Sequence, residues 1–105
     1  MADITGFIHM VYLWLPEDAA ADAAEKLSHG CRTYLAAIPG VLRLEVGSPA
    51  GTPRIVVDNS YAVALLVEFA DSAAHDAYQK HPLHRTFIDK CSFLASRVQI
   101  YDFLI

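Results

Sequence analysis

The residues best suited to chemistry lie close together in the segment AYQKHPLHRTF, residues 77–87. His84 is a candidate general base, because an imidazole with a pKa of about 6.5 can take and return a proton at neutral pH. Tyr78 is its candidate partner, because a phenol can donate a hydrogen bond to an enolate or orient a carbonyl. The alternative is structural: Tyr78 fills core volume and His84 bonds a backbone carbonyl where two helices meet.

The other histidines have less specific settings. His9 lies in an apolar strand, where it either lines the same pocket or is a buried imidazole with one hydrogen bond. His81 precedes a proline and mainly supplies hydrogen bonds at a helix end, and His75 is expected in solvent on an exposed helix. Because Pro82 breaks the helix between His75 and His84 and no carboxylate completes a ligand spacing, we expect no metal site.

The composition excludes several classes of function. The chain has 105 residues, 54% hydrophobic and 19% charged, with a net charge of −4. Nucleic acids and anionic membranes are unsuited partners, because basic residues do not cluster. One small domain cannot bury this many apolar residues, so we expect a homo-oligomer.

The start of the chain and its cysteines indicate the compartment. The apolar run Phe7 to Leu15 reaches only about half the length of a membrane span, and no basic residue precedes it as in a secretory signal. Cytoplasmic residence is therefore expected. Cys31 and Cys91 fit buried free thiols rather than a disulfide or zinc pair.

Hydrophobic periodicity and helix-breaking residues predict the order of the elements. We expect strands at residues 7–15, 41–47, 61–69 and 96–103, helices at 17–37, 73–80 and 83–94, and a long loop or ribbon at 47–60. Pro16 with Glu17 and Asp18 suits the start of the first helix, and Pro82 suits the start of the last.

This order, βαββ(αα)β, predicts a ferredoxin-like α+β fold with an antiparallel sheet and helices on one face. The other sheet face then lacks a cover. Pairing two such faces would bury Met10, Tyr12 and Trp14 and close a dimeric α+β barrel. Glu68 and Asp102 are expected to pair with Arg43, Arg97 or a backbone donor.

Five segments carry a resemblance to a known family: HMV at residues 9–11, IPGVLRLEVG at 38–47, YAVALLVEFAD at 61–71, AYQKHPLHRTF at 77–87 and YDF at 101–103. Over nearly its whole length the sequence resembles the stress-responsive A/B barrel (Dabb) family. The resemblance implies one domain over residues 1–105 and a dimeric barrel. Among relatives that are polyketide cyclases, a Tyr and two His act in proton transfer during ring closure, at positions that match Tyr78, His84 and His9. A further His of the cyclases is replaced here by Val63.

The resemblance predicts a protein that binds a small apolar or carbonyl compound, with cofactor-free cyclase, lyase or isomerase chemistry. Tyr78 and His84 are the candidate catalytic residues. The residues expected to bind substrate are His9, Val11, Leu13, Val63, His81 and Phe87. Such an enzyme needs an apolar pocket of at least ~300 Å³. The alternatives are a non-catalytic stress-associated homodimer and a cofactor-free monooxygenase.

Overall fold

The computed structural model describes residues 6–105 and contains four strands and three α-helices. The strands are β1 (Phe7–Trp14), β2 (Arg43–Gly47), β3 (Val63–Phe69) and β4 (Arg97–Leu104). The helices are α1 (Ala23–Gly30), α2 (Ser72–Lys80) and α3 (Pro82–Lys90), with a π-helical turn at Cys31–Leu35 and a 3₁₀ turn at Ser92–Leu94.

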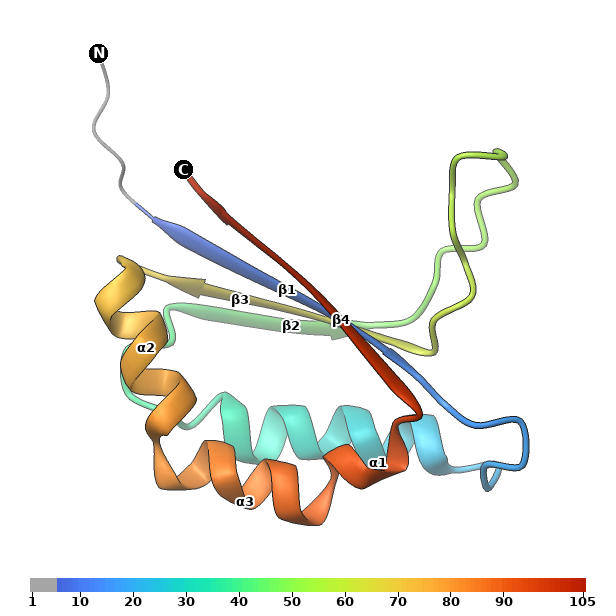
Figure 1. The fold of residues 1–105 in the computed structure, drawn as a ribbon, viewed down its shortest axis with the longest axis horizontal. Coiled ribbons are helices and arrows are strands. Elements are labelled where there is room, and N and C mark those ends of the chain that lie inside the picture. Colours follow the sequence, from blue (N-terminus) through green and yellow to red (C-terminus); the bar gives the residue numbers. More distant parts are fainter. Residues whose placement is uncertain (1–5) are drawn as a thin grey trace.

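The sheet has the order β2-β3-β1-β4, and every neighbouring pair is antiparallel. The helices all lie on one face of the sheet (Figure 1). This arrangement is the ferredoxin-like α+β fold, which confirms the predicted fold class. Within residues 6–105, no helix is long and apolar enough to cross a membrane.

The alternation of burial along β1 and β3 explains the two layers. In β1, Phe7, His9, Val11 and Leu13 are buried beneath the helices. Met10, Tyr12 and Trp14 point to the opposite face, which we call the open face, and are only half-buried. Side chains of successive strand residues point to opposite faces, so one apolar run supplies both the core and the open face.

The first helix is shorter than the prediction of residues 17–37. It begins at Ala23, because two consecutive turns, closed by Ala19 N–H to the Pro16 carbonyl and Ala23 N–H to the Ala20 carbonyl, precede it. Residues 17–22 carry no large apolar side chain, so packing against the sheet cannot stabilise a helix there. The helical path continues as the π-helical turn to Leu35.

The junction of α2 and α3 orients the candidate residues. Asp71 caps α2 by accepting a hydrogen bond from Ala74 N–H at 2.8 Å. His81 has extended backbone angles, ends α2, and caps α3 by accepting from Leu83 N–H through Nδ1 at 3.0 Å. Pro82 then starts α3 with its preset backbone angle. The resulting turn brings Tyr78 of α2 and His84 of α3 together.

Residues 48–60 form a long loop without regular structure. The loop projects from the sheet on the side away from the helices (Figure 1). Ile55 and Val56 in this loop are exposed. The alternative of a ribbon in this segment is therefore wrong.

Candidate functional site

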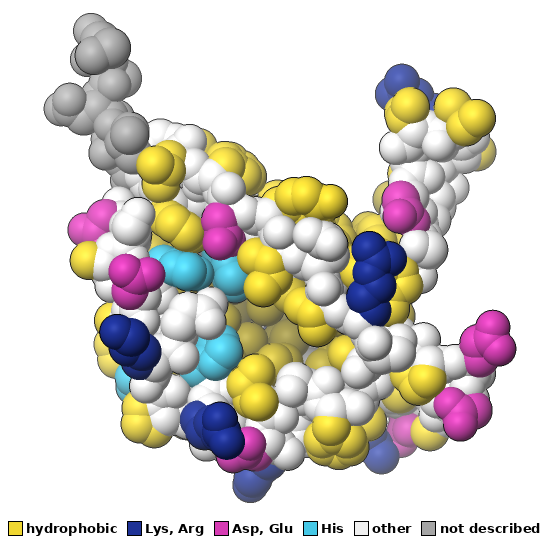
Figure 2. All heavy atoms as spheres, viewed as in Figure 1, with side chains coloured by type: hydrophobic (Ala, Val, Ile, Leu, Met, Phe, Trp, Pro, Cys, Tyr) yellow, Lys and Arg dark blue, Asp and Glu magenta, His cyan; other side chains and the backbone are white. Residues whose placement is uncertain are grey.

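A cavity of about 200 Å³ lies between the sheet and α3. Figure 2 shows the corresponding hollow, with apolar side chains inside it and histidine side chains along one rim. The cavity is lined by His9, Val11, Leu13, Leu35, Leu65, Tyr78, Gln79, His84, Phe87, Ile88, Ser92, Val98 and Ile100. It is smaller than the ~300 Å³ expected for an enzyme pocket, which restricts an occupant to a small molecule.

Tyr78 and His84 meet at this cavity, with ring centroids 5.0 Å apart and the rings nearly perpendicular. Burial raises the pKa of Tyr78, so its hydroxyl keeps its proton. That hydroxyl makes no hydrogen bond to residues 6–105, and no polar side-chain atom among them is both sealed from solvent and unpartnered. The hydroxyl therefore opens into the cavity, where it can donate to a bound oxygen.

His9 is paired with Asp102. Its Nδ1 lies 2.6 Å from the carboxylate of Asp102, which is directly opposite in the β1–β4 register. Burial lowers the pKa of His9 and outweighs the opposing effect of the carboxylate. The ring is then neutral at pH 7, donates from Nδ1 to Asp102, and keeps a lone pair on Nε2. The expectation that Asp102 pairs with an arginine or a backbone donor is wrong, because the register places it against His9.

His84 is a second neutral imidazole at the same cavity. Burial lowers its pKa, and the nearby His9 and His75 lower it further. A neutral ring can accept a proton, so His84 meets the chemical requirement for a general base.

His75 is not the solvent-exposed residue expected from the sequence. Its ring stacks on Phe7 with centroids 4.4 Å apart and lies 4.9 Å from the ring of His9. The spacing of three residues between His75 and Tyr78 puts both on one side of α2, and this spacing is the signal that could have placed it.

The structure brings together most of the residues expected to bind substrate. His9, Val11, Leu13 and Phe87 line the cavity together with Tyr78 and His84. Two of the expected residues do not line it. Val63 lies in the hydrophobic core, and the ring nitrogen of His81 is used to cap α3.

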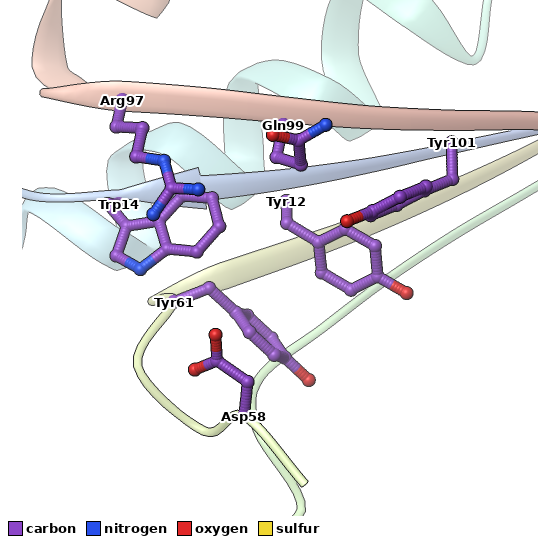
Figure 3. A pocket seen from close by; sticks show the side chains of 7 residues that line it. All are labelled: Tyr12, Trp14, Asp58, Tyr61, Arg97, Gln99 and Tyr101. Carbon is purple, nitrogen blue, oxygen red and sulfur yellow. The ribbon is translucent and has the colours of Figure 1, made fainter. Parts of the chain in front are cut away.

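A second pocket, of about 310 Å³, lies on the open face (Figure 3). Tyr12, Trp14, Asp58, Tyr61, Arg97, Gln99 and Tyr101 line it. The guanidinium of Arg97 lies 4.1 Å from the centroid of the Trp14 ring, and Trp14 Nε1 donates to Ser60 at 2.9 Å. This pocket holds aromatic rings and charged groups but no histidine, so the smaller cavity is the better site for proton transfer.

The profile of the family described as Stress responsive A/B Barrel Domain matches residues 7–105. The chain belongs to this family. The match covers all four strands and all three helices of the Dabb fold seen here. A search of curated proteins found no match to this Dabb chain.

Solved structures show the same fold. A Dabb family protein from Mesorhizobium loti has a TM-score of 0.75 at 24% identity, covering 94% of this chain and 95% of the other. A dimeric ferredoxin-like protein from Thermobifida fusca has a TM-score of 0.79 at 19% identity, with 100% and 95% covered. A hydroxynitrile lyase from Passiflora edulis has a TM-score of 0.82 at 11% identity, with 98% and 95% covered. At these identities the likeness concerns the fold alone.

The lowered pKa values of His9 and His84 predict that this Dabb chain becomes less stable in acid. In the unfolded chain His9 titrates at about 6.5, whereas in the folded chain it binds its proton only at lower pH. Between these two pKa values the unfolded state holds more protons, so stability falls as the pH drops below about 6.5. We expect the free energy of unfolding, measured by urea titration, to depend less on pH in His9→Gln than in wild type. An unchanged pH dependence would contradict the assignment.

Proposed function

We propose that the chain binds a small carbonyl compound in the cavity and transfers a proton on it without a cofactor. The observation that carries this proposal is the convergence of a protonated phenol and two neutral imidazoles, those of Tyr78, His84 and His9, on one mostly apolar cavity. Acid–base chemistry near neutral pH requires one group that donates and one that accepts, and the cavity offers both.

Each residue has a distinct role in the proposed reaction. The Tyr78 hydroxyl donates a hydrogen bond to the carbonyl oxygen and stabilises the enolate that forms there. His84 removes the proton from the carbon next to the carbonyl and returns it to the product. Nε2 of His9 accepts a hydrogen bond from a substrate hydroxyl, and Asp102 fixes the tautomer that leaves this lone pair free. Asp102 is then a positioning residue.

A similar structure supports the broader proposal that this fold can carry lyase chemistry. One solved structure with this fold is described as a hydroxynitrile lyase, a lyase acting on a small molecule. The cavity of about 200 Å³ restricts any substrate of this chain to a small molecule. The second candidate function is a non-catalytic stress-associated protein in which the same residues only hold the helix junction. It is supported by the cavity being smaller than the ~300 Å³ expected for an enzyme pocket.

Exchange of carbon-bound protons for deuterium separates these two functions. The rate is measured by NMR in D₂O with small enolisable ketones and diketones as probes. We expect wild type to exceed buffer, and His84→Asn and Tyr78→Phe to lower its rate about a hundredfold, as expected for the loss of a general base or an enolate donor.

The matched control is His29→Asn, because His29 lies on α1 and outside the cavity. It should leave the exchange rate unchanged. A wild-type rate equal to that of buffer, or equal rates for wild type and His84→Asn, would support the non-catalytic function instead.

We also propose that two copies pair through their open faces. The half-buried Met10, Tyr12 and Trp14 lie on this face, and Tyr101 and Phe103 of β4 are exposed beside them. The similar protein from Thermobifida fusca is described as dimeric. Burial of these side chains contributes roughly 1.5–3 kcal/mol for each large one, which favours association.

A further inference from the structure

Three potential ligand groups for a metal ion lie close together, each from a different element, and one of them, His9, also lines the cavity. They are the imidazoles of His9 on β1 and His75 on α2 and the carboxylate of Asp102 on β4. One ligating atom from each residue lies within 4.8 Å of those from the other two. The spacing of residues along the chain placed no carboxylate near the histidines, and no metal site was therefore expected. The β1–β4 pairing supplies that carboxylate, because it places Asp102 opposite His9.

The two imidazole rings are held in place by aromatic neighbours. The ring of His75 stacks on Phe7 at 4.4 Å and meets Phe69 edge-on at 5.6 Å. His9 is buried, with its ring 4.9 Å from that of His75. Ligands that are held before binding lose little conformational freedom when a metal binds, which favours affinity.

The nitrogens of His75 are available for a metal. They make only long contacts, 3.4 Å to the carboxylate of Asp76 and 3.3 Å to the amide of Gln79. The side chain of Asp76 is 71% exposed, and ion pairs so exposed contribute little. A metal–nitrogen bond can therefore replace these contacts at low cost.

The charge of the cluster suits a divalent cation. Among residues 6–105, the ion pair of Asp102 is with His9, and no lysine or arginine neutralises its carboxylate. Two imidazoles with one carboxylate form a donor set typical of zinc, iron, cobalt and nickel sites.

We propose that His9, His75 and Asp102 form a binding site for a divalent transition-metal ion of the zinc class. The side chain of Asp102 is 37% exposed, so water completes the coordination from the solvent side. Ligand atoms around a tetrahedral zinc ion lie about 3.3 Å apart. The ligand atoms must therefore move closer together, and the Asp102 side chain, which is 37% exposed, is the one with room to move.

Metal binding changes the hydrogen bonding of His9. The metal takes the lone pair of Nδ1 and replaces the hydrogen bond from Nδ1 to Asp102. The ring remains neutral, so its one proton moves to Nε2, and Nε2 changes from an acceptor to a donor. A bound metal would thus change how His9 meets a substrate in the cavity. Metal binding itself needs no substrate, so it can be measured separately from the proposed proton transfer.

Isothermal titration of the folded protein with zinc chloride alone, near neutral pH, tests the site. His75→Phe removes the ligating nitrogens but keeps a ring against Phe7, and Asp102→Asn keeps the size of the side chain. We expect each variant to bind zinc at least about tenfold more weakly than wild type, because one of three protein ligands is lost. His29→Asn is the matched control and should bind as wild type does.

NMR signals of the imidazole rings give a second readout that does not depend on the variants. Zinc should shift the ring signals of His9 and His75 in wild type and leave those of His29 unchanged. Zinc affinity in His75→Phe equal to that of wild type, or shifts confined to His29, would overturn the proposal. The zinc titration contains no substrate, so a failure to bind zinc would not count against the proposed proton transfer. Likewise, a failure of the deuterium-exchange experiment would not count against the metal site.

Discussion

Met10→Asp is expected to leave the chain monomeric. Met10 lies in the middle of β1 on the open face, opposite Leu66 of β3 and Tyr101 of β4, so no cation is beside it in the sheet. An unpaired charge buried at an interface costs about 3–5 kcal/mol, which weakens the dimer at least about a hundredfold. Sedimentation velocity should give the mass of one chain, 11.5 kDa, for the variant and twice that for wild type.

An aspartate at position 10 tests the interface more clearly than one at position 14. Trp14 is opposite Arg97 in the register, and the guanidinium of Arg97 already lies over its ring. An aspartate at position 14 could pair with Arg97 and lose much of its effect. The control is Phe93→Asp, which places the same charge on a side chain that is 70% exposed. A dimeric Met10→Asp protein, or a monomeric Phe93→Asp protein, would contradict pairing through the open faces.

Phe69→Ala is expected to lower the free energy of unfolding by about 3–5 kcal/mol, the usual cost of removing a buried phenylalanine ring. Phe69 is fully buried, and its ring contacts Phe7, His75 and Tyr78. The loss would be a large part of the stability of a chain of this size. Urea unfolding at one fixed chain concentration measures it, since the stability of a dimer depends on concentration.

Phe93→Ala provides the comparison for the same chemical change at an exposed position. It should change the free energy of unfolding by no more than about 0.5 kcal/mol. A loss for Phe69→Ala as small as that for Phe93→Ala would mean that the aromatic group around Phe69 is not the packed core described above.

Local patterns in the sequence predicted most of the fold. Alternating or continuous apolar runs located all four strands to within two residues at each end, because burial on one or both faces fixes the residue types. The predicted start of α2 at residue 73 lies one residue from the observed Ser72, and Pro82 correctly marked the start of α3. The start of α1 was predicted six residues too early. Pro16 and the two acidic residues after it are typical of a helix start, but they are just as compatible with an exposed turn.

The site was harder to predict because it depends on contacts between distant parts of the chain. The sequence pointed to Tyr78 and His84, which lie six residues apart across one proline. It did not reveal the His9–Asp102 pair, whose members are separated by 93 residues. A shift of one residue in the β1–β4 register would turn Asp102 to the open face, and composition does not specify that register.

Because β4 lies at the edge of the sheet, local unfolding of this strand can break the contact between Asp102 and His9. β4 pairs with β1 alone, whereas β1 and β3 each have two neighbours. Edge strands separate from a sheet at a lower free energy than global unfolding requires. Each such opening removes Asp102 from His9 while the remaining three strands and the helices stay packed. Metal affinity and the tautomer of His9 should therefore be lost at a lower temperature or urea concentration than the fold itself.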